Sequence, residues 1–320
     1  MLKVSILSIG DEICIGQVLN SNAQWIAEKC TEIGTEVIFH LTVGDNKQRL
    51  IESLIFLEKS SDVIIMTGGL GPTSDDITKP ILTEYFGDKL VFSDEVNADI
   101  EEFFRKRERE ISKMSLSQAE VPSKCRVIRN KLGTAPGMVF FEKERYYISL
   151  PGVPYEMKEM METSVIPMLI EEIERRHESV VKYKTIYTSG IPESNLAELI
   201  GNEREFLKEG ETLAYLPSTK GVRLRIGVPG PDFSSCDERL YEIEKTLISK
   251  ISNFVLPLEN KELTDTVCEL LKTKKKTLAV AESCTGGMLG AEITSVSGAS
   301  EFFIGGEITY SNWAKSARLN

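Results

Sequence analysis

The chain has 320 residues, of which 41% are hydrophobic and 27% charged, and its formal net charge is −11. This composition is typical of a globular protein in water, and the length exceeds one typical domain, so we expect two or three domains. The negative charge argues against partners such as nucleic acid or an anionic membrane surface. No apolar run reaches the roughly 18 residues that a membrane-spanning helix needs.

The cysteines and histidines limit the kinds of metal site. Six cysteines are scattered without a C-x-x-C spacing, and there are two histidines. The cysteines fit reduced thiols of a cytoplasmic protein rather than a disulfide framework or a zinc site. The first residues lead straight into a predicted strand and do not resemble a signal peptide. Any metal ion must therefore be held by oxygen ligands.

Strand and helix patterns alternate in the first part of the chain. Strands are predicted at residues 2–9, 37–43 and 63–66, and helices at residues 20–33 and 50–57. Short connections between them predict a parallel sheet with helices on both faces. Ligands of such sheets bind beyond the carboxyl ends of the strands.

Glycines and carboxylates cluster after each of these three strands, at residues 10–12, 44–46 and 68–76. Glycines let backbone N–H groups approach a phosphate closely. Adjacent carboxylates would repel a bare phosphate, so the combination predicts a divalent cation that bridges the two. The alternative is a Gly-rich turn followed by an Asp N-cap, which accounts for one of the two aspartates Asp75 and Asp76.

Further elements follow in order along the chain. A charged helix is predicted at residues 94–113, a strand pair at residues 139–141 and 146–150, and a long helix up to about residue 177. The loop at Pro151 and Gly152 precedes that helix. It either lines the ligand region at the carboxyl ends of the strands or is a plain connecting loop. The strand and helix pattern of residues 181–252 predicts a small α+β domain, in which no catalytic group of residues is obvious.

A third unit begins after Pro257. Its predicted helix at residues 263–271 and strand at residues 277–281 lead into a tight turn that contains Ser283. A serine at the start of a helix lies where the helix dipole stabilises an oxyanion, and Lys315 further on can act as a base if it is desolvated. The alternative is a Ser/Thr N-cap before a Gly-rich packing contact.

Several motifs together resemble the CinA family. In the first domain they are Gly10-Asp11-Glu12, Gly44-Asp45, Gly68–Thr78, Gly133–Gly137 and Leu150–Met157; further along they are Ser189–Ser194, Ala281–Gly287 and Thr309–Lys315. The resemblance implies an α/β chain of three domains. Residues 1–178 would form a three-layer molybdopterin-binding-like domain with a mostly parallel sheet, residues 179–256 a KH-like α+β domain, and residues 257–320 an incomplete α/β domain.

The resemblance also implies two activities. The first domain would be an ADP-ribose pyrophosphatase that needs a divalent metal, and the last would deamidate nicotinamide mononucleotide. In that last domain Ser283 would be the nucleophile and Lys315 its base, assisted by Tyr310 and Thr285. The family's domain is longer than the segment after Pro257, so we expect a truncated domain without deamidase activity.

These considerations give a first hypothesis of a metal-dependent pyrophosphohydrolase of ADP-ribose-like nucleotides that serves NAD-related recycling. The cation would be Mg²⁺, Mn²⁺ or Co²⁺, and the partner a small-molecule nucleotide; the small α+β domain suggests a homodimer. The predicted metal ligands are Asp11, Asp45, Asp75 and Asp76, with Asp45 and Asp76 also catalytic. The predicted nucleotide-binding residues are Gly10, Gly68, Gly69, Leu70, Gly71, Thr73, Pro151 and Gly152. The alternatives are a non-catalytic pterin- or nucleotide-binding module and an amidohydrolase acting through Ser283.

Overall fold

A six-stranded sheet with the order β2-β1-β3-β8-β7-β6 organises the N-terminal part of the chain. Its strands are β1 (Lys3–Ile9), β2 (Glu36–Val43), β3 (Val63–Thr67), β6 (Arg126–Ile128), β7 (Gly137–Glu142) and β8 (Arg145–Leu150). β1 pairs in parallel with β2 and β3, and β3 pairs in parallel with β8. The pairs β7–β8 and β6–β7 are antiparallel. The predicted mostly parallel sheet is confirmed.

The structure is a computed structural model that describes residues 1–73, 76–218, 221–256 and 263–319. The chain divides into two units. The first comprises Met1–Tyr183, Glu209–Glu211 and Gly227–Glu242, and the second comprises the remaining segments between Lys184 and Asn320.

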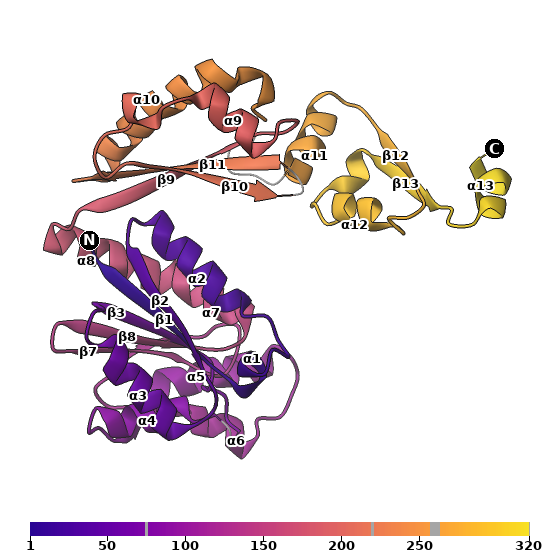
Figure 1. The fold of residues 1–320 in the computed structure, drawn as a ribbon. Helices are drawn as coiled ribbons and strands as arrows, with labels where there is room; N and C mark the ends of the chain where they lie inside the picture. The colour runs from indigo at the N-terminus through magenta and orange to yellow at the C-terminus, as the bar shows by residue number, and fades with distance from the viewer. Residues whose placement is uncertain (74–75, 219–220, 257–262, 320) are drawn as a thin grey trace. The chain divides into compact units, whose positions relative to one another are not determined.

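Helices cover both faces of the six-stranded sheet. Helices α2 (Ser21–Glu32), α7 (Pro154–Met160) and α8 (Ile166–Arg176) lie on one face, and α3 (Lys47–Leu57) and α4 (Thr78–Tyr85) lie on the other (Figure 1). Both faces must therefore be apolar, and six of the seven residues of β1 are buried. The core below α3 and α4 is formed by side chains such as Leu7, Leu54, Ile64, Met66, Leu82 and Phe140.

Smaller elements complete this part of the chain: α1 (Asp11–Cys14), β4 (Leu90–Phe92), α5 (Asp94–Arg105), α6 (Lys113–Leu116) and β5 (Glu120–Pro122). The helix predicted at residues 94–113 ends at Arg105, and the prediction of a longer helix is wrong. Residues 106–110 carry only charged side chains, so no apolar stripe holds them against the core. Glu108 adopts a left-handed φ of 52°, which interrupts the helix.

The long helix predicted up to residue 177 is present but contains a wider turn. A π-helical segment, Met161–Val165, separates α7 from α8. Pro167 at the start of α8 has no N–H to donate, and such a residue commonly causes a local change of helix geometry.

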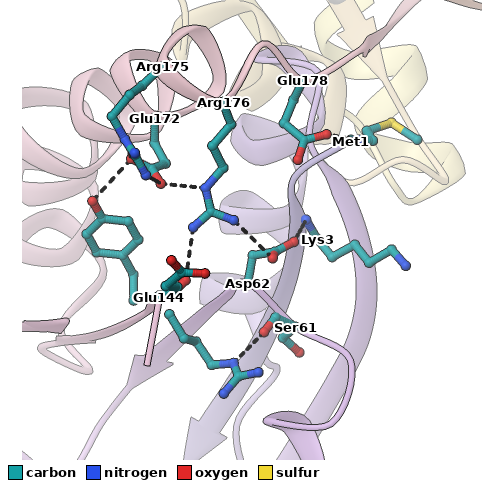
Figure 2. A network of polar contacts seen from close by, with 11 residues as sticks. Met1, Lys3, Ser61, Asp62, Glu144, Glu172, Arg175, Arg176 and Glu178 are labelled. Atoms are coloured by element: carbon teal, nitrogen blue, oxygen red, sulfur yellow. Dashed lines mark hydrogen bonds and ion pairs between the residues drawn. The ribbon is translucent and has the colours of Figure 1, made fainter. Parts of the chain in front are cut away.

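A polar network lies at the amino ends of β1 and β3, opposite the strand ends that carry the glycine clusters. Glu172 of α8 accepts hydrogen bonds from Arg175 and Arg176 (Figure 2). Arg176 also contacts Asp62 Oδ1 at 3.2 Å and donates to the Glu144 carbonyl at 2.9 Å. The end of α8 is thereby tied to the start of β3 and to the β7–β8 turn.

The rest of the chain forms two smaller sheets. The strands β9 (Val180–Tyr187), β10 (Thr212–Ser218) and β11 (Gly221–Gly230) form a sheet with the order β10-β11-β9, accompanied by α9 (Glu193–Ile200) and α10 (Phe233–Ile251). Further on, β12 (Leu278–Glu282) and β13 (Phe303–Ile308) pair in parallel. The helices α11 (Leu263–Thr273), α12 (Met288–Thr294) and α13 (Asn312–Leu319) belong to this last segment. Cys268, Ile293, Ala299 and Phe302 form its core.

Candidate functional site

The loops that follow β1, β2, β3 and β8 line one cleft of about 480 Å³. Parallel strands bring their carboxyl ends to one edge of the sheet, so residues far apart in sequence meet there. Of the predicted site residues, Gly10, Asp45, Gly68, Gly69, Leu70, Gly71, Asp76, Pro151 and Gly152 line this cleft. Asp11 and Thr73 do not line it but contact residues that do. Asp75 lies outside the described residues.

The turn after β3 requires glycine for steric reasons. Gly68 has a φ of 109°, and a Cβ there would lie 2.1 Å from the Ile9 carbonyl oxygen. Gly69 has a φ of 64°, and Thr78 fixes this turn by donating from its N–H to the Gly69 carbonyl at 3.0 Å and from Oγ1 to the Gly68 carbonyl at 3.0 Å. Within the described residues, the N–H groups of Gly69, Leu70 and Gly71 donate to no acceptor. They are the candidate donors for an anion in this cleft, whose lining includes all three residues.

Asp11 and Asp45 contact each other across the ends of β1 and β2. The Asp11 N–H donates to Asp45 Oδ2 at 3.0 Å, and the Asp45 N–H donates to Asp11 Oδ1 at 3.2 Å. Between them, a Cβ on Gly44 would lie 2.1 Å from Asp11 Oδ1, so a larger residue at this position would push the two loops apart. The structure therefore brings together two of the four predicted metal ligands.

Asp76 is held in the loop before α4. Thr73 donates to Asp76 Oδ2 from its N–H at 2.9 Å and from Oγ1 at 2.5 Å. Helix α4 begins at Thr78 with Ile77 as its N-cap residue and no side-chain cap, so Asp76 is not the Asp N-cap of the alternative interpretation. Burial lowers the pKa of nearby Lys79, while the charges of Glu120 and Asp76 raise it.

Of the metal ligands predicted from sequence, the described residues bring Asp11 and Asp45 into contact, and Asp75 lies outside them. In the described part of the chain, no three His, Cys, Asp or Glu side chains are arranged to hold a metal ion. Mg²⁺ is commonly bound by one or two carboxylates together with substrate phosphates. The donor set of Asp11 and Asp45 fits a cation of that kind, shared with a ligand, better than a cation enclosed by protein alone.

Glu156 also lines the cleft, and the sequence did not single it out. It lies in the first turn of α7, where an acidic residue is common because of the helix dipole. Its side chain is nevertheless buried, and Asn130 Nδ2 donates to its Oε2 at 2.6 Å. Burial raises the pKa of Glu156, although the Asn130 and Tyr155 hydrogen bonds act in the opposite direction. Its position within the Leu150–Met157 motif was the signal available in the sequence.

A second cleft, of about 420 Å³, lies in the C-terminal segment and is lined by Ser283, Thr309 and Lys315 among others. Ser283 and Lys315 are therefore brought to one site, whereas Tyr310 does not line it and is 74% exposed. Lys315 is also exposed.

At the start of α12 the backbone N–H groups bind a neighbouring carboxylate rather than pointing free towards Ser283. The buried Glu282 carboxylate accepts from the N–H groups of Gly287, Leu289 and Gly290, at 3.1, 3.0 and 2.8 Å. Burial alone would raise the pKa of Glu282, but these hydrogen bonds lower it. These N–H groups at the start of α12 therefore donate to Glu282 and are not free to stabilise an oxyanion at Ser283.

Three family models match successive parts of the chain. Residues 5–171 match the model described as "Probable molybdopterin binding domain", residues 183–255 the "Damage-inducible protein CinA KH domain", and residues 260–320 the "CinA C-terminal domain". A CinA-like protein of Flavobacterium psychrophilum is 43% identical over 99% of this chain and 76% of its own length. A CinA-like protein of Chloroherpeton thalassium is 39% identical over the same shares.

This chain belongs to the CinA family. The family recognised from the motifs is therefore confirmed, as is the α/β fold with a molybdopterin-binding-like first domain followed by a KH-like and a CinA C-terminal domain. Among solved structures, the protein CinA of Thermoplasma acidophilum is 30% identical over 52% of this chain and 97% of that one, with a TM-score of 0.47. MoaB of Pyrococcus furiosus, described as a tungsten cofactor synthesizing protein, is 19% identical over 55% of this chain and 96% of that one, with a TM-score of 0.38.

None of the helices among the described residues is both long enough and apolar enough to cross a membrane.

Proposed function

We propose that the first domain of this CinA-family chain hydrolyses the diphosphate bond of ADP-ribose-like nucleotides with the help of a divalent cation. The observation that carries this proposal is the composition of the 480 Å³ cleft. Backbone N–H groups from Gly69 to Gly71 and the carboxylates of Asp45 and Asp76 meet at its edge, a combination suited to two phosphates and a cation.

The cleft also offers an apolar wall for the nucleoside part of such a substrate. Ile13, Val18 and Leu19 line it, and Leu19 is 90% exposed. An exposed apolar wall beside a polar edge supports a ligand that is partly apolar, because burial of Leu19 against a base would stabilise the complex. Inorganic phosphate or pyrophosphate would leave this wall in water.

The chain's own residues would bind and orient the substrate. The N–H groups of Gly69 to Gly71 would donate hydrogen bonds to the negative charge that develops on a phosphate oxygen. Thr73 would keep Asp76 in place. Asp11 and Asp45 would hold the cation, which polarises a phosphorus–oxygen bond and lowers the pKa of water when bound.

The test is a substrate screen with the purified chain. ADP-ribose and other nucleoside diphosphate derivatives are incubated with Mg²⁺, Mn²⁺ or Co²⁺, and the release of AMP is followed by chromatography. Metal-dependent AMP release is the expected result. Binding of the nucleotides, measured by calorimetry, without hydrolysis under any of these metals would favour the alternative of a non-catalytic binding module.

The cleft that contains Ser283 and Lys315 favours a second candidate, amide hydrolysis in the C-terminal domain. A lysine acts as a base when burial removes its proton, whereas Lys315 is exposed, and Glu282 occupies the N–H groups at the start of α12. We therefore expect no measurable deamidation of nicotinamide mononucleotide by these 320 residues. Ammonia release that is abolished in Ser283→Ala would contradict this expectation.

A further inference from the structure

Glu156 is a buried carboxylate that lines the cleft without a structural reason for its charge. Its residue is 7% exposed, and within the described chain no Lys or Arg nitrogen lies within 4.0 Å of its oxygens. Burying a carboxylate without a cationic partner is costly. Such groups gather at functional sites, where their proton affinity is used.

The contacts of Glu156 also do not fit a helix-capping role. Helix α7 has Val153 as its N-cap residue and no side-chain hydrogen bond to its first N–H groups. The carboxylate is instead directed to Asn130, and a Cβ on Gly133 would lie 2.2 Å from its Oε2. Gly133 thus provides the space that the carboxyl group fills.

Asn130 holds Glu156 in a defined orientation. Its Oδ1 accepts from the N–H groups of Leu132 and Gly133 at 3.0 and 2.9 Å, and its Nδ2 donates to the Ala135 carbonyl at 2.9 Å. These contacts fix which side of the amide is the donor, so Nδ2 must face Glu156. A buried amide with all its contacts made is a suitable positioning residue for a reactive carboxylate.

We propose that the Glu156 carboxylate is the general base of this cleft and that it takes a proton from the water that attacks the diphosphate. This inference rests on the proposed function. The water oxygen forms a bond to one phosphorus, the bond between that phosphorus and the bridging oxygen breaks, and the bridging oxygen leaves on the other phosphate. One water proton passes to Glu156 and then to solvent, and the other stays on the phosphate that the water attacked. ADP-ribose and water thus give AMP and ribose 5-phosphate, one of them as its monoanion, and one proton.

The charged and titratable groups around Glu156 support this role. Burial is the largest influence on its pKa and raises it; the Asn130 and Tyr155 hydrogen bonds and the Arg107 charge lower it. Arg107 is exposed and its guanidinium stacks on Phe103 at 3.7 Å from the ring centre. Among the described residues, the other carboxylates that line the cleft are Glu12, Asp45 and Asp76. A base with a raised pKa is a stronger proton acceptor near neutral pH.

The experiment compares the full chain with Glu156→Gln and with a control, Glu162→Gln, an exposed residue just beyond the same helix. ADP-ribose hydrolysis is measured over a pH series at saturating divalent metal. In Glu156→Gln we expect kcat to fall about 10²-fold or more, with KM little changed and the acidic limb of the pH profile lost. The control should behave like the wild type.

A second variant, Asn130→Asp, retains the acceptor for Leu132 and Gly133 but removes the donor to Glu156. It should move the acidic limb to higher pH, because the carboxylate loses a hydrogen bond and gains a negative neighbour. A melting temperature measured for every variant separates misfolding from a chemical effect. If the wild type hydrolyses ADP-ribose and folded Glu156→Gln keeps its kcat and acidic limb, the role of Glu156 is overturned. Absence of hydrolysis by the wild type with every metal overturns the proposed function and, with it, this inference.

Discussion

At the scale of single residues, Asp76 is the clearest test of the cleft. Its carboxylate accepts two hydrogen bonds from Thr73, and it belongs neither to a helix nor to an ion pair within the described chain. Asp76→Asn keeps the shape and one acceptor oxygen but removes the charge. We expect nucleotide hydrolysis to fall about 10²-fold or more, while the free energy of unfolding changes by no more than about 1 kcal/mol.

Asp88→Asn is the matched control for that variant. Asp88 also accepts hydrogen bonds from a loop, at 2.5 Å from Ser123 and 2.8 Å from Lys124, but it does not line the cleft. Its substitution should alter stability slightly and leave the hydrolysis rate as it is. Normal hydrolysis by Asp76→Asn would show that this carboxylate is not needed.

The apolar wall gives a second prediction about one residue. Leu19→Ser removes an exposed apolar side chain from the cleft, so folding should be unaffected. If the wall packs against a nucleoside, the lost apolar contact of about 1.5 kcal/mol should raise KM roughly tenfold without changing kcat. Leu199→Ser, on the exposed side of α9, is the control. An unchanged KM for ADP-ribose would mean that the nucleoside lies elsewhere.

At the scale of elements, the end of α8 depends on the Glu172 network (Figure 2). The hydrogen bond from Arg175, followed by that from Arg176, lowers the pKa of Glu172 from 4.5 to about 2. Because the folded-state pKa is depressed, this stabilisation is fully present above the unfolded-state pKa. It is lost as the pH falls from about 4.5 towards about 2.

Glu172→Gln should therefore destabilise the protein by about 2 kcal/mol at neutral pH, with a smaller difference from the wild type at pH values near 3. Chemical denaturation at several pH values measures this. Glu171→Gln, an exposed neighbour on the same helix, should have little effect at any pH. A difference between wild type and Glu172→Gln that does not shrink on acidification would contradict the role of the charge.

At the scale of the whole molecule, the residues of the proposed diphosphate site lie within residues 1–178, and those of the second cleft lie between Ala281 and Leu319. In the described part of the last segment, one cluster of four buried apolar side chains forms the core, while Met288, Ile304 and Trp313 are each at least 68% exposed. Loss of this segment should therefore not disturb the first cleft.

A chain that stops after Leu256 should hydrolyse ADP-ribose as the full chain does. Steady-state kinetics of both forms, with matched metal occupancy, check this expectation. A large loss of kcat in the shortened and still folded protein would place part of the diphosphate site in the C-terminal segment.

The local order of strands and helices could be predicted from the sequence because apolar residues recur with the period of the strand or helix that they form. The apolar run at residues 63–66 predicted β3, and the helix predicted at residues 20–33 is α2, whose buried residues include Ile26 and Cys30. The convergence of the glycine clusters also followed from the sequence, since parallel strands share one carboxyl edge. Helix ends were less predictable, because α5 ends where its apolar stripe ends rather than where its charges do.

The sequence by itself determined the family, the mostly parallel sheet and the edge of the sheet where the cleft lies. Tertiary structure alone decided which polar groups are buried and which face one another. It paired Asp11 with Asp45, turned Asp76 towards Thr73 and directed Glu282 to the start of α12. It also buried Glu156 against Asn130, a contact between residues 26 positions apart that no local pattern reveals. Periodicity records which side of an element is apolar, whereas the proton affinity of a carboxylate depends on neighbours that only the folded chain brings together.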